Sequence, residues 1–373
     1  MRVVLLADRS FATREQGMLA RLQVGLTDEG CRVVRAVPGD ERAEVDDALG
    51  PMLVYDDRPS LAPTSLRAGA LLQKSARFGL TPSGHDDRPV DVVHAFGDGC
   101  WRTARALAEA SGAVLALEVW SHDAMSAAHR LDAAHRKDER FPRERFVWLA
   151  PDSAMDGALR SSMPSANVRL TPWGVHVPGE VAAFSRAAES ITAVLVGSGR
   201  QTSACLAAIG ALGRLVDAFP QLFIFVDDAF VQASHSIWKA ADHGRLLPRF
   251  SVIENLEGRR EPALRADLLI QPEARGERRT ILLDSMAAGM AVVAREDPNA
   301  DAPVDGQTGV IVPGGSGPAW ESSLRRLLAD LDGARAMGLR AREFIRSERL
   351  ASAHLRAVLN AYVAGVAMAA STA

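Results

Sequence analysis

The chain has 373 residues, a formal net charge of −3, 47% hydrophobic residues and 24% charged residues. This length predicts two domains, each long enough to bury a substantial core. The nearly balanced charge gives no global field that favours nucleic acid or an anionic membrane. The aromatic content of 5% also argues against stacking platforms for single-stranded nucleic acid.

Three cysteines, Cys31, Cys100 and Cys205, lie far apart in the sequence. An odd number without close pairs argues against a disulfide framework or a structural zinc site, so we expect three buried thiols. The apolar run at the N-terminus, residues 1–8, is too short for a secretory signal or a membrane helix and predicts a buried first strand. We expect a cytoplasmic location and leave a peripheral membrane contact open.

Short apolar runs alternate with helical stretches in the first half of the chain. The expected strands are residues 3–7, 33–37, 90–95, 113–120, 146–150 and 168–170, and a helix is expected over 12–30. Continuous apolar strands between helices indicate a parallel sheet that is covered on both faces. Residues 55–87 are rich in Pro, Arg, Ser and Gly, which predicts a loop or a helical insertion.

A break with two prolines at residues 172–178 predicts the interdomain linker, and the pattern then restarts. The expected strands are 191–196, 222–226, 251–253, 266–271, 291–294 and 309–313, and the expected helices are 203–219, 232–243, 318–332, 333–348 and 351–368. We therefore predict an α/β fold with domains at 1–178 and 179–350, followed by a C-terminal helix at 351–373 that crosses back to the first domain. Ligands of such sheets bind beyond the carboxyl ends of the strands.

The segment from 272 to 289 has the pattern of a ligand-binding loop. A strand ends in a polar loop, and a short apolar helix follows and stops at Gly289. The amides of Arg279, Thr280 and Ile281 would lie at the helix N-terminus, where unpaired N–H groups and the helix dipole favour a diphosphate. Asp284 follows Thr280 by four residues and therefore shares its helix face.

This helix and the strand after it, Asp-Ser-Met-Ala-Ala-Gly-Met-Ala-Val-Val at 284–293, resemble a motif of group 1 (family 4) glycosyltransferases. The family motif is Glu-Ala-Met-Ala-(Ala/Ser)-Gly-x-Pro-Val-Val. Residues 171–175 are similar to the family's linker Pro-Asn-Gly-Val, 305–312 to Asp-Gly-x-(Thr/Asn)-Gly-x-Leu-Val, 334–338 to the helix after it, and 91–95 to Asp-Val-Val-His-Ala. The resemblance spans nearly the whole chain and is strongest over 266–345.

The resemblance implies the GT-B architecture, in which two Rossmann-like domains face each other across a crevice. It also implies retaining transfer of a sugar from a nucleotide-diphosphate sugar to an acceptor hydroxyl, without a metal or another cofactor. The first domain would be the acceptor side and the second the nucleotide-sugar side. The acceptor, a sugar, a lipid or a small molecule, is not identified by any motif.

The resemblance also implies donor-binding residues. Asp284 takes the position of the acid that holds the ribose, and Ile253 lies on the strand that passes the nucleobase. The glycine turn after the first strand of the second domain contributes Gly197, Gly199 and Arg200, the last of which would neutralise the diphosphate.

The family's lysine that follows this arginine is replaced by Cys205. We hypothesise that a local cluster of Arg275, Arg278 and Arg279 substitutes for the lysine, because guanidinium groups suit phosphate. The alternative is an ordinary solvated basic loop.

For the transferred sugar, the resemblance points to His122 and to an acid eight residues before Asp284. That position is Gly276, so we assign Glu277, one residue later, together with His122 as catalytic candidates; Glu273 lies three residues early. The alternatives are a helix-capping role for Glu277 and a surface or structural role for His122.

His94 and the loop at residues 9–14, both in the N-terminal half, need separate interpretation. His94 at a strand end is a core or a crevice residue. Residues 9–14 replace the family's glycine pair and still open a helix, with Ser10 or Thr13 available as its cap.

Two other functions stay open. The displaced acid, the missing lysine and the missing glycine pair are typical of a catalytically inactive relative that binds a nucleotide sugar or a partner protein. A sugar-nucleotide epimerase or a phosphorylase on the same fold is a second enzyme alternative.

Overall fold

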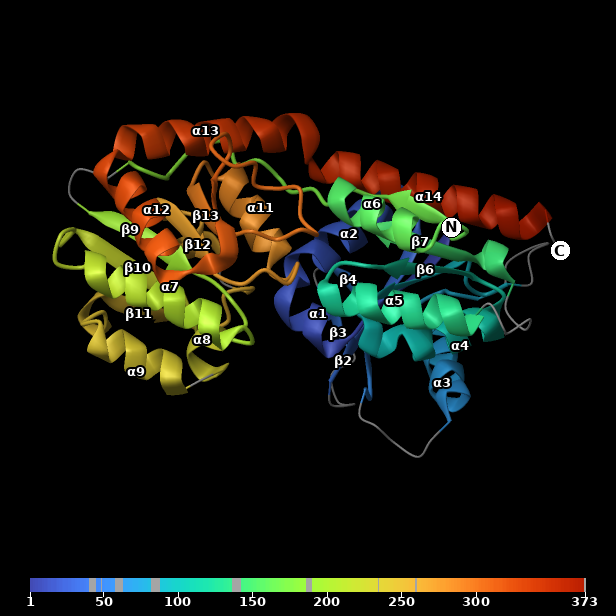
Figure 1. Cartoon of the computed structure of the whole chain (residues 1–373). Coiled ribbons are helices and arrows are strands. Elements are labelled where there is room, and N and C mark those ends of the chain that lie inside the picture. The colour runs from blue at the N-terminus through green and yellow to red at the C-terminus, as the bar shows by residue number, and fades with distance from the viewer. Residues whose placement is uncertain are drawn as a thin grey trace. The chain divides into compact units, whose positions relative to one another are not determined.

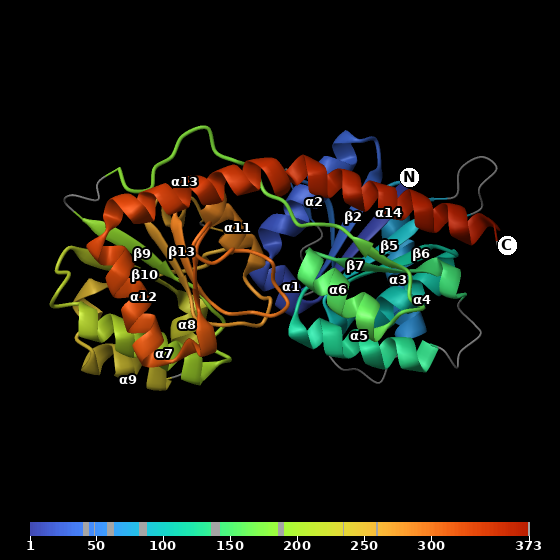
Figure 2. The same ribbon diagram turned by 45° about the horizontal axis from the view of Figure 1, so that its top comes forward.

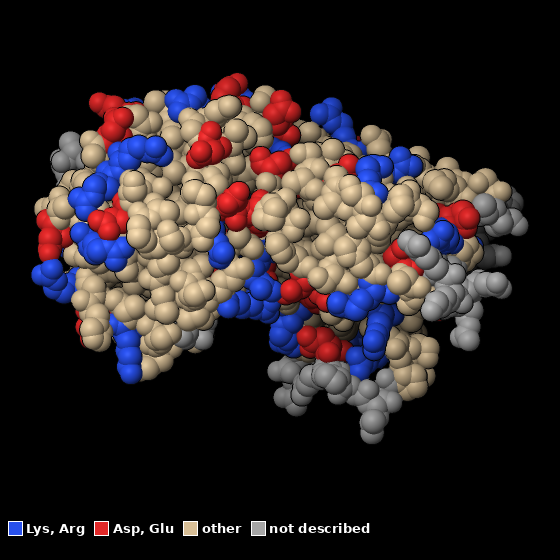
Figure 3. Space-filling view, viewed as in Figure 1, with Lys and Arg blue, Asp and Glu red and all other residues tan. Residues whose placement is uncertain are grey.

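The computed structural model of the chain describes residues 1–39, 45–47, 49–57, 63–81, 88–135, 142–185, 190–233, 235–258 and 260–371. The chain forms two compact units (Figure 1). Unit 1 comprises Met1–Trp173 with Ala351–Ala373, and unit 2 comprises Gly174–Leu350. We had placed the domain limits after residues 178 and 350. Acidic and basic side chains are interspersed on the face seen in Figure 3, as the small net charge leads one to expect.

Unit 1 is built on a sheet with the strand order β3-β4-β2-β1-β5-β6-β7-β8. Neighbouring strands are parallel, except that β3 runs antiparallel to β4. The strands are β1 (Arg2–Ala7), β2 (Arg32–Pro38), β3 (Val45–Asp47), β4 (Gly50–Tyr55), β5 (Val92–Phe96), β6 (Val114–Glu118), β7 (Phe146–Ala150) and β8 (Val168–Leu170). Every residue of β1, β5, β6 and β7 is buried, as the continuous apolar runs predicted.

The helices of unit 1 are α1 (Arg9–Arg14), α2 (Gln16–Asp28), α3 (Thr64–Ala76), α4 (Trp101–Ser111), α5 (His122–His135), α6 (Ser153–Ser162) and α14 (Ala351–Ser371). The single helix expected over 12–30 was wrong, because α1 ends at Arg14 and α2 starts after Glu15. The capping residue also differs from the prediction. The Asp8 carboxylate accepts a hydrogen bond from Phe11 N at 2.8 Å, so Asp8 and not Ser10 or Thr13 caps α1.

The C-terminal helix α14 belongs to unit 1 and runs beside α2 (Figure 2). Its Gly365 lies against β6 and β7, where an added Cβ would be 3.0 Å from Val114 and 3.1 Å from Val147. Among the described helices, α14 alone is long and apolar enough to cross a membrane. The core helix of a soluble protein passes the same test, and 33% of this helix is buried.

Unit 2 is built on a wholly parallel sheet with the order β11-β10-β9-β12-β13-β14. The strands are β9 (Ile191–Leu195), β10 (Leu222–Asp227), β11 (Phe250–Ile253), β12 (Leu268–Gln271), β13 (Ala291–Arg295) and β14 (Val310–Val312). The helices are α7 (Thr202–Leu215), α8 (Asp228–Ala233), α9 (His235–His243), α10 (Arg260–Ala263), α11 (Arg279–Ala287), α12 (Gly317–Ala329) and α13 (Leu331–Glu348). This is the Rossmann order, and its topological switch point lies between β9 and β12.

Strands β3 and β4 depart from the sequence prediction, which included neither of them. The stretch 55–87 contains helix α3, which agrees with the helical insertion that was one of its two expected structures, and residues 58–62 and 82–87 lie outside the described residues. The single helix expected over 232–243 is two helices, α8 and α9. The three cysteines are free and buried, as predicted.

Candidate functional site

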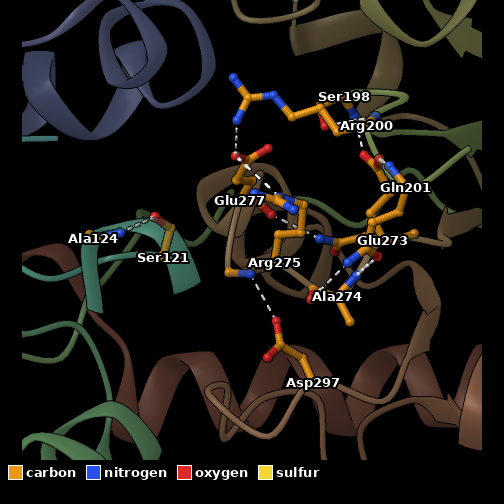
Figure 4. Close-up of polar contacts among 12 residues, drawn as sticks. Ser121, Ala124, Ser198, Arg200, Gln201, Glu273, Ala274, Arg275, Glu277 and Asp297 are labelled. Carbon is orange, nitrogen blue, oxygen red and sulfur yellow. Dashed lines mark hydrogen bonds and ion pairs between the residues drawn. The ribbon is translucent and has the colours of Figure 1, made fainter. Parts of the chain in front are cut away.

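Two loops meet at the carboxyl edge of the unit 2 sheet, one after β9 and one after β12 (Figure 4). The buried carboxylate of Glu273 joins them, because it accepts hydrogen bonds from the backbone N–H groups of Ser198 and Gln201, the latter at 2.7 Å. Hydrogen bonds to an ionised acceptor are stronger than neutral ones. The chain therefore fixes the two loops at the topological switch point, where ligands of such sheets bind.

The side chain of Gln201 adds a second connection between the loops. Its Oε1 accepts hydrogen bonds from Ala274 N at 3.0 Å and from Arg295 Nη1 at 3.1 Å, and its Nε2 donates to the Ala274 carbonyl at 3.4 Å. Gly197 is required for this close approach. A Cβ there would lie 2.8 Å from the Glu273 carboxylate and 2.9 Å from the Phe230 ring.

Glu277 lies between two arginines (Figure 4). Its Oε1 is 3.3 Å from Arg200 Nη1 and 3.8 Å from Arg275 Nε. The Glu277 side chain is 6% exposed, whereas that of Arg200 is 46% exposed. Because the Arg200 side chain is already largely in solvent, it can turn towards a ligand without first being exposed from the protein interior.

Position 276, where the family carries its first acid, is a turn. Gly276 has φ of +72°, and its N–H donates to the Asp297 carboxylate at 2.8 Å. This left-handed conformation suits glycine, so the reshaped loop presents the carboxylate one residue later, at Glu277. The side chain of Arg278, the residue that precedes α11, makes no capping hydrogen bond. The helix-capping role considered for Glu277 stays a hypothesis.

Helix α11 begins where the sequence predicted. Arg278 precedes it in a left-handed conformation with φ of +60°, and the backbone amides of Arg279, Thr280 and Ile281 form its first turn. Asp284 lies one turn further on and is buried, and its carboxylate accepts a hydrogen bond from the Arg260 guanidinium. Asp284, the residue expected to bind the ribose, therefore has the cationic side chain of Arg260 beside it, which the sequence did not predict.

Arg260 belongs to a buried chain of alternating charges. It also pairs with Glu257, which lies 3.2 Å from Arg278 Nη1, and Arg278 Nη2 in turn lies 2.6 Å from Asp227. Burial raises the pKa of Asp227 to about 6, against the opposing pull of the Arg278 charge. Asp227 ends β10 in register with Ile253, the residue assigned to the nucleobase strand.

The three arginines that the sequence suggested as a phosphate-binding cluster, Arg275, Arg278 and Arg279, make different contacts in the structure. Arg278 is 4% exposed and pairs with two carboxylates, which favours a structural role over the phosphate-binding role hypothesised from the sequence. Arg279 is also buried, and its Nη2 donates to the Asn299 carbonyl at 3.2 Å. Arg275 lies beside Glu277, with its Nε 3.8 Å from Glu277 Oε1.

Cys205, at the position of the family's lysine, is a buried thiol beside Glu273. Burial raises its pKa, and the Glu273 charge raises it further. A small cavity of about 40 Å³ opens next to these loops, lined by Glu273, Glu277 and Arg279 among others. That volume holds only a few water molecules.

His122 is the first residue of α5 in unit 1, and the Ser121 hydroxyl caps this helix by accepting from Ala124 N at 3.2 Å (Figure 4). The His122 side chain is half-buried. Because Glu277 belongs to unit 2, the two catalytic candidates occupy different units. Their shared contact with a sugar stays a prediction.

His94 is a core residue. Its Nδ1 is 2.6 Å from the Tyr362 hydroxyl and its Nε2 is 3.1 Å from Glu118, which also accepts from Trp173 Nε1 at 2.7 Å. Burial lowers the pKa of His94 to about 3, so the ring is neutral. Neutral His94 then donates to Glu118 and accepts from Tyr362.

Sequence reasoning found the loop and its helix but missed the residues that join them. Glu273 was noted only as a displaced acid, although its place directly after Pro272 puts it at the strand end. Gln201, Arg260 and Glu257 gave no motif at all, because their roles come from contacts between segments that are distant in the sequence.

No family model and no curated protein sequence matches this chain significantly. Solved structures do. Sucrose-phosphate synthase from Thermosynechococcus elongatus is 13% identical with a TM-score of 0.74, covering 97% of this chain and 98% of that one. Anabaena HepE, in complex with UDP and glucose, is 13% identical with a TM-score of 0.69 and coverages of 96% and 98%. A glycosyltransferase from Rickettsia africae is 12% identical with a TM-score of 0.69 and coverages of 97% for both chains.

At these identities the likeness shows the fold. The predicted α/β class is confirmed: two Rossmann-type parallel sheets with flanking helices follow one another along the chain, as in the GT-B glycosyltransferases. The facing arrangement of the two domains and the roles of the site residues stay predictions. The chain has the fold of a group 1 glycosyltransferase.

Proposed function

We propose that this chain is a retaining glycosyltransferase that moves a sugar from a nucleotide-diphosphate sugar to an acceptor hydroxyl, without a metal or other cofactor. One observation carries the proposal. At the switch point of the unit 2 sheet, two loops that are hydrogen-bonded to each other hold Arg200 and Arg275 around Glu277, next to the N-terminus of helix α11. Such a terminus with adjacent guanidinium groups suits a diphosphate.

In this proposal the diphosphate rests on the amides of Arg279, Thr280 and Ile281. Arg200 and Arg275 turn from Glu277 towards the phosphates and offset the charge that develops on the leaving group, which is an electrostatic contribution to catalysis. Release from the arginines leaves the Glu277 carboxylate available to the transferred sugar, together with His122 from the acceptor-side unit. Asp284, oriented by Arg260, accepts from the ribose hydroxyls.

A panel of nucleotide sugars tests the proposal through hydrolysis or transfer, with nucleoside diphosphate affinity measured by calorimetry. We expect Arg200→Ala to weaken nucleoside diphosphate binding and turnover at least tenfold. Glu277→Gln should keep the affinity and lose turnover. The matched control is Arg214→Ala, because Arg214 is a half-exposed arginine of the same unit that pairs with Glu321. Retention is read from the anomeric configuration of the product. No binding of any nucleoside diphosphate would overturn the proposal.

A second candidate, an inactive relative that binds a nucleotide sugar or a partner protein, is favoured by one specific observation. The lysine position holds the neutral Cys205 thiol beside the Glu273 carboxylate, so a cation is missing where leaving-group charge develops. The same panel separates the two candidates, since tight binding without hydrolysis or transfer supports the inactive relative.

A further inference from the structure

A groove in unit 1 lies among helices α3, α4 and α5. It encloses about 880 Å³, which is within the size range of small-molecule sites, and we call it the α3–α4–α5 groove. Figure 3 shows basic side chains over α4, between α5 and α3. The groove belongs wholly to unit 1, so nothing in its description depends on the donor loops.

Two arginines line the groove from different helices, Arg102 on α4 and Arg130 on α5. Both are exposed, and neither pairs with any acid among the residues that the structure describes. Their neighbour Arg105, by contrast, donates to Glu109 at 2.8 Å. Two guanidinium groups that come from different helices of one groove and form no ion pair among the described residues favour an anion, and phosphate or carboxylate matches their geometry best.

The indole of Trp101 provides an independent observation. Trp101 lines the groove and is 4% exposed, yet its Nε1–H has no hydrogen-bond partner among the residues that the structure describes. A buried donor without a partner is destabilising, so such groups are rare in folded proteins. Trp101 lies on α4 at the groove, so a ligand bound there would change the surroundings of this N–H.

The remaining polar groups of the groove extend this pattern. Helix α3 begins at the groove with Thr64, and Pro63, which precedes it, has no side-chain group that could cap its first amides. The carboxylates of Asp98 and Glu109 also line the groove and can accept hydrogen bonds from ligand hydroxyls. The groove thus combines cations for an acidic group with acceptors for several hydroxyls.

We propose that the α3–α4–α5 groove binds a saccharide that carries a phosphate or carboxylate group. Arg102 and Arg130 hold the anionic group, the acids accept hydrogen bonds from the sugar hydroxyls, and the Trp101 side chain lies beside the bound ligand. The groove is separate from the donor loops, so this proposal can be tested independently of the proposed glycosyl transfer.

The NMR resonance of the Trp101 indole N–H can report ligand binding at this site directly. The intact protein is labelled with ¹⁵N at its tryptophan indoles, and the Trp101 resonance is assigned by its loss in Trp101→Phe. The probes are glucose 6-phosphate, glucuronate, unmodified glucose and inorganic phosphate. We expect the Trp101 resonance to shift with glucose 6-phosphate or glucuronate, less with inorganic phosphate, and not with glucose.

The double variant Arg102→Ala/Arg130→Ala should weaken this binding at least tenfold. The control removes two other exposed arginines of unit 1, Arg160 and Arg169, and should leave the affinity unchanged. A Trp101 resonance that responds to no sugar acid at millimolar concentration would overturn the proposal, as would an unchanged affinity in the double variant. Binding to phosphatidylglycerol vesicles without a response to glucose 6-phosphate would replace the saccharide with a lipid headgroup and would also overturn it.

Discussion

The carboxylate of Glu273 accepts a hydrogen bond from the backbone N–H of Gln201 at 2.7 Å, and this contact joins the loops that follow β9 and β12. Unit 1 repeats the arrangement. There the Asp8 carboxylate, directly after β1, accepts from Gly99 N at 3.0 Å in the turn that follows β5. In each unit an acid therefore spans the two strands of the topological switch point. The loops expected to meet ligands are held by the protein's own charges before any ligand arrives.

The first prediction concerns this connection in unit 2. Glu273→Gln replaces an acceptor-only carboxylate with an amide whose NH₂ group faces a backbone donor, so one buried N–H loses its partner. We expect a loss of about 2 kcal/mol in the stability of unit 2 and faster hydrogen exchange at residues 196–201. Exchange measured by mass spectrometry checks this. The exposed Glu254→Gln is the matched control, and equal exchange in the two variants would contradict the role given to Glu273.

The elements around this site were largely predictable. Residues 266–271 and 291–294 are apolar runs between helices, which specify buried parallel strands whatever their surroundings, and Gly289 marked the end of α11. The side-chain directions were not predictable. Arg275, Arg278 and Arg279 look alike in the sequence, but the left-handed backbone at Arg278 and the distant acids Asp227 and Glu257 send Arg278 into the interior. Such contacts are specified by the folded chain and leave no local pattern.

The second prediction separates these three arginines by single substitution. Arg275→Ala should weaken nucleoside diphosphate binding about tenfold, which corresponds to the roughly 1.4 kcal/mol expected for one lost charge-assisted hydrogen bond. Arg279→Ala should leave the affinity nearly unchanged, because this guanidinium donates to the Asn299 carbonyl. Calorimetric titration measures both affinities.

Arg278→Ala should act on stability instead. It leaves Asp227 and Glu257 buried without their shared cation, and removing one partner of a buried ion pair costs about 3–5 kcal/mol. Thermal unfolding measures this loss. An Arg278→Ala variant with wild-type stability and weakened nucleotide binding would restore the phosphate role first assigned to this residue.

The third prediction concerns the buried contacts between α14 and the unit 1 sheet. Tyr362→Phe removes the hydroxyl that lies 2.6 Å from His94 Nδ1 and leaves that buried nitrogen without its donor. We expect a loss of about 1–3 kcal/mol. The control is Val363→Ala on the same helix, whose side chain is 57% exposed and whose substitution should change stability by less than about 0.5 kcal/mol. Urea unfolding followed by tryptophan fluorescence compares the two, and equal midpoints would show that the His94 contact does not stabilise unit 1.

The fourth prediction concerns pH and Asp227. The pKa of this carboxyl is 3.8 ordinarily and about 6 in the folded protein. Between these values the folded state keeps a proton that the unfolded state has lost, so this group stabilises the fold at low pH and its contribution disappears as the pH rises through 6. At about 1.4 kcal/mol per pKa unit, the full contribution is about 3 kcal/mol.

Asp227→Asn removes this titration. The difference in melting temperature between wild type and variant should therefore change steadily from pH 4 to pH 7, with the wild type relatively more stable at the acid end. The comparison is needed because the pKa values of the buried His94 and His354 are lowered to about 3, which destabilises both proteins equally on acidification. Calorimetric melting across this range, with the exposed Asp242→Asn as control, measures the difference. A difference independent of pH would mean that Asp227 stays ionised through pH 4, held by Arg278 more strongly than burial opposes it.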